Sequence, residues 1–589
     1  MLVKFYQVAC ISALLVFNPN LVNAQPFDTK AFVQEDREPE AATGLTEKKA
    51  VKTKKFMVAA ANPYASKIGY NILAKGGSAI DAAIAVQLAL TIVEPQSSGI
   101  GGGTFILHWE NSGKKLTTFD GRETAPALAT SDLFLDEQGK AIPWIKAVVG
   151  GRSVGVPGVL AALKKAHQQY GKLPWETLFK DAINLAERGF RVSPRLEKLV
   201  QMQFNPGISE LPEIRRYFFP NGRAIKAGDK LRNPKLAKVF RSLAKEGTTP
   251  FYQGWIAEKI VSAVQHSSIA PGRLSLTDMK NYQAIEREPV CGPYRYYKVC
   301  GMAPPSSGGI AVIQIMSQLE PFQLHKRELE DVQTSHLYTQ SSRLAFADRN
   351  RYIADNDFVD VPVSGLLSKD YLAERSKLIN IHQDMGEALP GRPEASIALA
   401  DDSAMELPST SHISIVDDQG NAVSMTTSIE MAFGSAVMVE GFILNNQLTD
   451  FSLSPKVNGK LVANRLEPLK RPRSSMAPMM VFEGEKLKLV VGSPGGSRII
   501  NYVTQTILAM LDWKLDPQQA INLPKITNRN KVTTLEKGTS IVKLKSGLEA
   551  KGHNIAVRDL NSGLHVIEVK NNGLVGGADP RREGKVMGQ

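Results

Sequence analysis

The chain has 589 residues, of which 43% are hydrophobic and 22% charged, and its formal net charge is +13. This composition excludes a disordered or fibrous protein, and the length suffices for several ordinary domains or one large, elaborated one. The basic excess does not predict nucleic-acid binding, because no recognisable module joins a basic face to interleaved aromatic residues. We therefore expect a globular protein with no nucleic-acid partner.

Residues 1–24 have the features of a secretory signal peptide. A short segment with Lys4 precedes the apolar run 8–17, and Val22-Asn23-Ala24 supplies a small-residue cleavage site. The apolar run is well short of the roughly 20 residues that span a bilayer. We predict an exported protein, periplasmic or secreted, with no membrane span once the signal is removed.

The next segments predict a lead-in followed by two helices. Residues 25–55 are polar and lack periodicity, which indicates a flexible lead-in, so the fold is expected to begin near Phe56. A first helix is predicted over 62–74. Ser78 is positioned to cap a second helix over 79–93, which is almost wholly apolar and is therefore expected to be buried in a large core.

Further along the chain, helical and strand-like segments alternate. Helices are predicted over 158–170, 175–188, 331–351, 369–379 and 498–511. Strands dominate after residue 409, over 411–416, 422–428, 441–445, 479–482 and 488–492. This mixture fits a layered α/β fold with a candidate boundary at Ser409.

The segment 151–155 fits the Gly-x-Ser-x-Gly pattern of a serine nucleophile that follows a strand. Pro157 and Gly158, however, fall where the helix after such a serine should already be running, and proline is costly inside a helix. We interpret Ser153 as structural, which leaves a serine esterase as a less favoured alternative.

Two cysteines, Cys291 and Cys300, flank the turn signal Gly292-Pro293 between β-prone residues. An oxidising compartment permits a disulfide between them, and two free, buried thiols are the alternative. Neither interpretation suits a catalytic cysteine.

The segment from Thr410 to residue 428 predicts a β-hairpin, with a Gly/Asn/Asp-rich turn over 417–421. Pairing centred on Gln419 places Ser428 opposite Thr410. If the chain is cut before Thr410, the freed α-amine can accept the proton of the hydroxyl group on the same residue. The hairpin alone favours a cross-strand Thr/Ser pair that only stabilises the sheet. His412 is expected to have a structural role, because an N-terminal threonine needs no other base.

A glycine motif lies at 491–498, with the sequence Val-Gly-Ser-Pro-Gly-Gly-Ser-Arg after a strand and before a helix. The backbone amides of Gly495 and Gly496 can receive an anion or a developing oxyanion there. The motif lacks the Lys-Ser/Thr ending of a phosphate loop, and no His-Glu-x-x-His pattern occurs. We predict neither a metal nor a cofactor.

Together with other motifs, these segments resemble the gamma-glutamyltransferase family (gamma-glutamyltranspeptidases) of N-terminal-nucleophile hydrolases, from about residue 56 to 582. The matching motifs are GGSAIDAA at 76–83, GGG at 101–103, RETAP at 122–126, PPSSGG at 304–309, ADR at 347–349, NNQ at 445–447, RPRSSMAP at 471–478 and ADPRR at 578–582. The resemblance implies a four-layer αββα sandwich. It also implies self-cleavage between Ser409 and Thr410, which divides the precursor into a large subunit, 56–409 after the lead-in, and a small catalytic subunit, 410–589.

The implied reaction is glutathione hydrolysis or γ-glutamyl transfer. Thr410 would attack glutathione or another γ-glutamyl compound, and water or an amino acid or dipeptide acceptor would take the acyl group. By the same resemblance, Ser428 lies beside the nucleophile and Gly495 with Gly496 forms the oxyanion site. The substrate-binding residues would be Arg122, Ser474 and Ser475 for the α-carboxylate, and Gln447 and Asp450 for the α-amino group.

One position departs from the family pattern: Glu430 stands where bacterial members commonly have Asn. It could add a second negative contact to the substrate ammonium, or it could favour another donor. The alternative is therefore a related amidase of the cephalosporin-acylase or poly-γ-glutamate-processing kind. The segment 452–470, between two proposed site elements, is predicted to be a lid-like loop.

Overall fold

The computed structural model describes residues 46–407 and 409–589, so the predicted signal peptide and residues 25–45 of the lead-in lie outside the described part. Within that part, no helix is long and apolar enough to cross a membrane. The predicted lead-in is wrong in its last residues, because β1 (Val51–Thr53) pairs with β22 (Gly573–Ala578). The Lys48 ammonium, just before β1, donates to the carbonyls of Asp579, Arg582 and Gly584 and fixes this segment.

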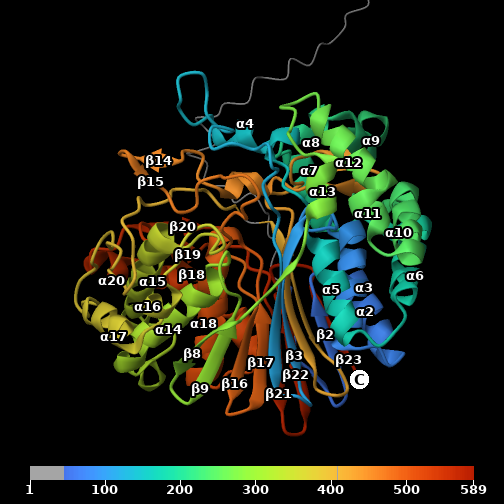
Figure 1. The fold of residues 1–589 in the computed structure, drawn as a ribbon. Helices are drawn as coiled ribbons and strands as arrows, with labels where there is room; N and C mark the ends of the chain where they lie inside the picture. The colour runs from blue at the N-terminus through green and yellow to red at the C-terminus, as the bar shows by residue number, and fades with distance from the viewer. Residues whose placement is uncertain (1–45, 408) are drawn as a thin grey trace, which may run out of the picture. The chain divides into compact units, whose positions relative to one another are not determined.

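Two seven-stranded antiparallel sheets form the centre of the fold (Figure 1). The first has the order β23 (Lys585–Gly588), β2 (Met57–Ala60), β10 (Thr410–Val416), β11 (Ala422–Ser428), β3 (Gly103–Glu110), β4 (Lys115–Gly121) and β7 (Ile285–Arg287). The second has the order β1, β22, β21 (His565–Lys570), β17 (Lys486–Gly492), β16 (Met479–Glu483), β9 (Tyr297–Gly301) and β8 (Val290–Tyr294).

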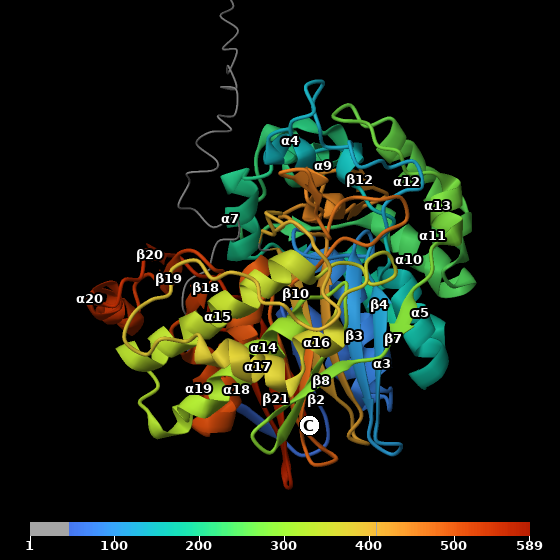
Figure 2. The same ribbon diagram turned by 60° about the vertical axis from the view of Figure 1, so that its left-hand side comes forward.

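Helices cover the outer face of each sheet (Figures 1 and 2). The first sheet packs against α2 (Pro63–Ala74), α3 (Ala79–Val93) and α5 (Val159–Tyr170). The second packs against α14 (Gly308–Leu319), α18 (Ile499–Asp512) and α19 (Pro517–Asn522), with α15 (Val332–Tyr352) against α14. The two sheets contact each other through β10, β11, β17 and β21, so the predicted four-layer αββα sandwich is confirmed.

The remaining longer elements lie around this sandwich. The predicted helix over 175–188 divides into a 3₁₀ segment, η2 (Trp175–Phe179), and α6 (Lys180–Arg188). The other helices of nine residues or more are α7 (Pro194–Met202), α10 (Pro234–Glu246), α12 (Trp255–Gln265) and α17 (Lys369–Lys377) in the described residues. A three-stranded sheet joins β18 (Ile526–Asn528), β19 (Thr533–Glu536) and β20 (Ile555–Arg558).

Helix α3 is buried along its whole length, as its composition predicts. Ser78 and Asp81 form a capping box that satisfies backbone amides at its N-terminus. The helix packs on Ile413 and Ile415, the apolar positions of β10. Their burial anchors the strand that begins at the candidate nucleophile.

The alternate positions of β10 face the second sheet. The Ser414 hydroxyl donates to the carbonyl of His565 across the interface. The His412 ring contacts the hydroxyls of Thr426 and Ser414, and burial lowers the pKa of His412 well below its ordinary value. These contacts give the imidazole a structural position between the sheets.

Two further segments answer questions that the sequence leaves open. Cys291 and Cys300 are directly opposite each other on β8 and β9 and form a disulfide. The segment 452–470 contains a small hairpin of β14 (Lys456–Val457) and β15 (Lys460–Leu461).

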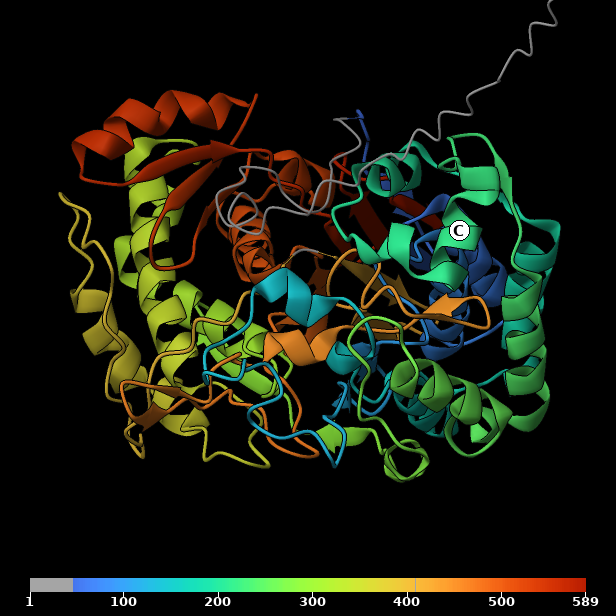
Figure 3. The ribbon, with the colours of Figure 1, turned by 90° about the horizontal axis from the view of Figure 1, so that it is seen from above.

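Seen from above, the cyan segment around α4 (Trp144–Val148) lies beside the orange segment of the 3₁₀ helix η6 (Gln447–Asp450) (Figure 3).

Candidate active site

Thr410 is the first residue of β10, and the pairing of β10 with β11 places it opposite Ser428. The predicted hairpin register is therefore confirmed. The two hydroxyl oxygens are 3.2 Å apart, and the Ser428 hydroxyl donates to the carbonyl oxygen of Ser409 at 2.9 Å. Because the Ser428 proton is used in that bond, Thr410 is the donor in the first one. The hydrogen bonds run from Thr410 through Ser428 to the carbonyl of the preceding residue.

The residue before the candidate nucleophile is held on its other side as well. The Ser409 hydroxyl donates to the carbonyl of Gln96 at 2.7 Å, and Gln96 donates to Glu94. Ser409 and Thr410 are both buried. The peptide between them is therefore fixed from two directions, by Ser428 and by Gln96.

Arg122 and Asp450 form a buried ion pair next to this peptide. Arg122, directly after β4, donates to Asp450 at 2.5 Å and to the carbonyls of Pro472 and Arg473. Gln447 donates to the same carboxylate at 2.7 Å. Burial raises the pKa of Asp450 to about 6 against the opposing charge of Arg122. The cation and the anion predicted to bind an amino-acid group are thus paired with each other.

Glu430 follows the end of β11 with a φ of 77°, in the left-handed region that non-glycine residues rarely adopt. Its backbone amide donates to the Ser428 hydroxyl at 2.9 Å. Its carboxyl accepts from Asn446 at 2.5 Å and from the amide of Leu407 at 3.3 Å. Burial, reinforced by the negative charge of Asp450, raises the pKa of Glu430 well above its ordinary value.

Ser474 and Ser475 form another wall. Ser474 is held by the segment 304–309: its backbone amide donates to the carbonyl of Pro305 at 3.0 Å, and the Ser307 hydroxyl donates to its carbonyl at 2.8 Å. The Ser475 hydroxyl accepts from Arg349 at 2.7 Å. Arg349 belongs to one of the motifs that carry the family resemblance, yet the sequence assigned it no role.

Gly495 and Gly496 lie between β17 and α18, both with positive φ. A Cβ at Gly496 would lie 2.7 Å from the carbonyl carbon of Leu407, so no other residue fits this backbone approach. The segment before the predicted cleavage point therefore packs directly on the glycine pair.

One cavity collects most of the predicted site residues. Its volume is about 20 Å³, enough for roughly one water molecule. Glu406, Leu407, Met476 and Ile499 line it too, so the segment before Thr410 forms part of its wall. Of the predicted residues, the cavity brings together Arg122, Thr410, Ser428, Glu430, Gln447, Asp450, Ser474, Ser475 and Gly496, whereas Gly495 is not on its wall.

Glu406 is a site residue that the sequence did not reveal. Its carboxylate forms ion pairs with Arg349 and with Arg473, the latter at 3.4 Å. Burial alone would raise its pKa, but the two arginine charges outweigh burial and lower the pKa of Glu406 to about 2. The sequence shows acidic residues upstream of Thr410, but it does not show which arginines they contact.

The serine-esterase alternative finds no support in the described residues. Ser153 lies in the 3₁₀ turn η1 (Gly151–Ser153), where its hydroxyl donates to the carbonyl of Val148 at 2.5 Å. Within residues 46–407 and 409–589, no group of three or more His, Cys, Asp or Glu side chains is arranged to hold a metal ion.

The four αββα layers, with the hydroxyl pair of Thr410 and Ser428 at the start of a central strand, define an N-terminal-nucleophile hydrolase fold. The family model for gamma-glutamyltranspeptidase matches residues 65–589. The chain is 39% identical over 545 residues to a glutathione hydrolase proenzyme of Bacillus subtilis (strain 168), covering 90% of this chain and 91% of that protein.

Two further relatives carry another name. Acylase ACY 1 proenzyme of Pseudomonas sp. (strain SE83) is 32% identical over 550 residues, covering 92% of this chain and 94% of that protein. The crystal structure of a cephalosporin acylase from Bacillus halodurans superposes with a TM-score of 0.81 at 28% identity, covering 93% of this chain and 98% of that one. Since the family model spans most of the chain, the protein belongs to the gamma-glutamyltranspeptidase family.

Proposed function

We propose that this chain is the precursor of an exported gamma-glutamyltransferase and glutathione hydrolase, activated by cleavage between Ser409 and Thr410. The observation that carries the proposal is the hydrogen-bond sequence from Thr410 through Ser428 to the Ser409 carbonyl. It presents a hydroxyl nucleophile beside the carbonyl that it must attack, while a second hydroxyl polarises that carbonyl. Membership of the family supports the same reaction.

The cleavage is an acyl shift followed by hydrolysis. Thr410 Oγ1 forms a bond with the Ser409 carbonyl carbon, the C–N bond breaks, and the hydroxyl proton passes through Ser428 to the leaving nitrogen. Water then hydrolyses the ester and restores the Thr410 hydroxyl. The products are a carboxylate at Ser409 and an amine at Thr410, and the amine serves as the base in later turnovers.

Donor binding follows from the residues around the cavity. A γ-glutamyl group carries an α-carboxylate and an α-ammonium, and these two charges can replace the partners in the Arg122–Asp450 ion pair. Ser474 and Ser475 supply hydroxyls to the carboxylate, and Gln447 supports Asp450. The Thr410 hydroxyl attacks the γ-carbonyl, and the amides of Gly495 and Gly496 stabilise the oxyanion. Water or an amine then takes the acyl group.

Acylases among the relatives make an amidase with another acyl donor the second candidate. Glu430 bears on the choice, because it lies in the same cavity as Asp450. Two carboxyl groups at one wall favour a donor with an α-ammonium, since a donor without one would leave the Asp450 charge facing no cation once Arg122 binds the donor carboxylate. We therefore favour the γ-glutamyl donor.

Export is proposed from the N-terminal pattern and is supported by the disulfide between Cys291 and Cys300, a bond that persists in oxidising compartments. The large subunit would then begin at Gln25 and end at Ser409.

Mass spectrometry of the purified exported protein, combined with turnover of γ-glutamyl p-nitroanilide and of glutaryl p-nitroanilide, tests the proposal. We expect two fragments, the second beginning at Thr410, and release of nitroaniline from the γ-glutamyl compound at least tenfold faster. A folded, active, uncut chain would refute self-cleavage. A preference for the glutaryl compound would favour the amidase.

A further inference from the structure

A strongly basic surface lies over α9 (Pro212–Phe218), α10 and the segment that joins them. Between residues 215 and 245 the sequence has ten lysine and arginine residues and one acidic residue, Asp229. All ten basic side chains are exposed. We call these ten side chains the basic face.

The fold neutralises few charges of the basic face. Arg216 and Lys235 share one partner, because both pair with Glu213. Arg241 pairs with Glu187. The other seven basic side chains form no ion pair within residues 46–407 and 409–589. The basic face therefore has positive charge to offer to a partner.

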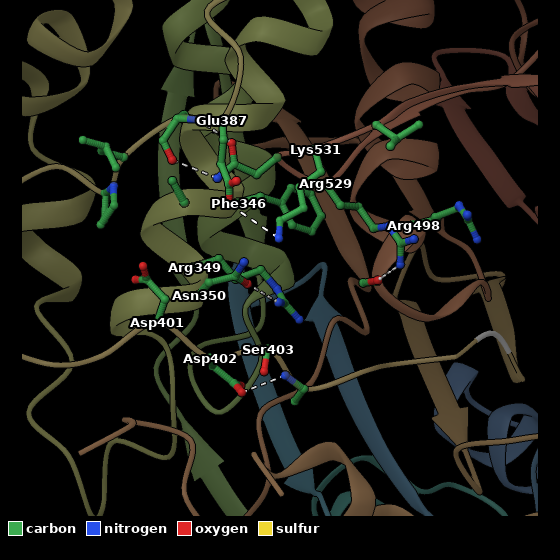
Figure 4. Close-up of a pocket in the computed structure, with 18 of the residues that line it drawn as sticks. Phe346, Arg349, Asn350, Glu387, Asp401, Asp402, Ser403, Arg498, Arg529 and Lys531 are labelled. Atoms are coloured by element: carbon green, nitrogen blue, oxygen red, sulfur yellow. Dashed lines mark hydrogen bonds and ion pairs between the residues drawn. The ribbon is translucent and has the colours of Figure 1, made fainter. Parts of the chain in front are cut away.

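A second group of basic side chains, around the pocket shown in Figure 4, gives the contrast. Lys531 and Glu387 line the same pocket, and their charged atoms are 3.7 Å apart. Arg349, on the same lining, pairs with Glu406 of the neighbouring segment. The fold supplies carboxylates to these cations, which it does not do for most of the basic face.

The basic face extends in two directions. Along α10 it runs from Lys235 to Lys245, which is about 15 Å of helix. Across α10, the ion pair of Lys235 with Glu213 joins this helix to α9, and the ion pair of Arg241 with Glu187 joins it to α6. In Figure 1, α6 and α10 lie at the right-hand side of the molecule. A broad array of charges fits a flat partner better than a single polymer strand.

This concentration of like charge opposes folding. Lys230 lies directly opposite Arg191 in the strand pair of β5 and β6, and like charges at paired positions repel each other. On α10, Lys238, Arg241 and Lys245 are spaced by three and four residues, where like charges destabilise a helix. Stability of the fold therefore does not explain the basic face, whereas an anionic partner does.

No exposed apolar anchor accompanies the charge. Within the described residues from 129 to 275, no large hydrophobic side chain is exposed. The apolar side of α10, with Leu236, Val239, Phe240 and Leu243, is buried in the core. Attraction to a bilayer would therefore depend on charge alone, without insertion of side chains.

We propose that the basic face docks this protein on an anionic phospholipid surface, with the phosphate headgroups as its partners. Each lysine or arginine near such a surface adds attraction, and salt screens this attraction. None of the ten side chains lines the inner cavity, so docking uses no residue of the candidate active site. The inference goes beyond the proposed reaction and does not depend on it.

The test is sedimentation of the purified exported protein with two kinds of vesicle: phosphatidylglycerol mixed with an equal part of phosphatidylcholine, and phosphatidylcholine alone. We expect binding to the mixed vesicles at low salt, no binding to phosphatidylcholine, and loss of binding as sodium chloride is raised. The variant Arg223→Gln/Lys226→Gln/Lys230→Gln/Lys245→Gln removes four of the seven charges without an ion pair. It is expected to weaken binding on the order of 10²-fold.

The matched control removes four exposed lysines from α17 and from the segment around α20 (Lys545–Ala550), which Figure 1 shows on the opposite side of the molecule. This control is Lys369→Gln/Lys377→Gln/Lys543→Gln/Lys545→Gln. It lowers the net charge by the same amount and should bind the vesicles as the wild type does. Circular dichroism and urea unfolding show whether each variant is folded, without reference to self-cleavage.

A smaller variant, Arg215→Gln/Arg232→Gln, is expected to weaken binding about tenfold and tests the inference if the fourfold variant does not fold. Absence of wild-type binding to the mixed vesicles, or equal weakening by the pocket-free control and the variants of the basic face, would overturn the inference. Retention by immobilised polyphosphate without binding to vesicles would also overturn it, because the partner would then be a soluble polyanion. Nitroaniline release tests the proposed function separately.

Discussion

The two walls of the inner cavity each bury a glutamate. Their surroundings favour the ionised carboxylate on one wall and the protonated carboxyl group on the other. Glu406 meets Arg349 and Arg473, which together lower its pKa to about 2 although burial opposes them. Glu430 meets an amide side chain and faces Asp450, so burial and a like charge both raise its pKa. Burial is common to both, and the neighbouring charges decide the outcome.

Because of this difference, the ion pairs at the Glu406 wall need no ligand, whereas a ligand can bind at the Glu430 wall. The carboxylate of Glu406 already pairs with two arginines, as an anionic ligand would, and Arg473 also pairs with Asp402. At the Glu430 wall, the raised pKa favours the protonated form of Glu430, so the charge of Arg122 is balanced by Asp450. The α-carboxylate and α-ammonium of a donor would take the place of the partners in that ion pair, whereas removal of Glu406 would leave Arg349 without its anion on the opposite wall.

Both glutamates are described in the uncut chain. The largest effect is expected from preventing cleavage. Thr410→Ala removes the hydroxyl that attacks the Ser409 carbonyl and that later carries the acyl group. We expect a single chain on a denaturing gel and complete loss of γ-glutamyl turnover, measured by mass spectrometry and nitroaniline release. The matched control is Ser153→Ala, which should still yield two fragments. Retained cleavage in Thr410→Ala would contradict the nucleophile assignment.

The uncut Thr410→Ala chain also allows the Glu406 wall to be tested alone. Adding Glu406→Gln leaves the buried Arg349 without its anion and removes one of the two carboxylates that pair with Arg473, which is expected to lower the free energy of unfolding by about 3 kcal/mol. Urea unfolding measures the loss. Asp401→Asn is the control, because its pair with Arg351 is much more exposed and should cost about 0.5 kcal/mol or less. Equal losses would show that Glu406 is not held by its arginines.

The pH dependence has a definite sign for the same residue. The pKa of Glu406 is lowered from 4.5 to about 2, so its stabilising contribution is complete above pH 4.5 and is lost as the pH falls toward 2. The Glu406→Gln difference should therefore shrink over that range, which unfolding measurements at several pH values would detect.

The sequence predicted one wall of this cavity better than the other because of how its contacts are made. Thr410 and Ser428 belong to one hairpin, and a period of two residues with a recognisable turn fixes their register. Glu406 lies 57 residues from Arg349 and 67 from Arg473, so no local pattern pairs them, and only the tertiary fold brings them together. The buried helix α3 was predictable from apolar composition, whereas β1 was not, because three residues carry almost no periodicity.

The wall that carries Glu430 is tested by removing the charge of Asp450, which pairs with Arg122. Asp450→Asn should lower kcat/KM for γ-glutamyl p-nitroanilide roughly 10²-fold, because the donor ammonium loses a buried anion. Since burial raises the pKa of Asp450 to about 6, the wild-type value should also decline as the pH falls below 6. Steady-state kinetics from pH 5 to 8 would measure both effects. Asp418→Asn, in the exposed hairpin turn, is the control and should leave kcat/KM unchanged.

The smallest effect, and the one that completes the contrast, is expected from Glu430→Gln in the Thr410→Ala chain. Because the folded pKa of Glu430 is raised, the folded chain retains a proton that the unfolded chain loses above pH 4.5, so stability falls as the pH rises through the folded pKa. Glutamine keeps the shape without that cost. Unfolding free energies at pH 4.5 and pH 8 should therefore show the variant gaining on its parent at the higher pH, opposite in sign to Glu406→Gln. Parallel pH profiles would mean that Glu430 is ionised in the folded chain, and the two walls would then not differ in charge.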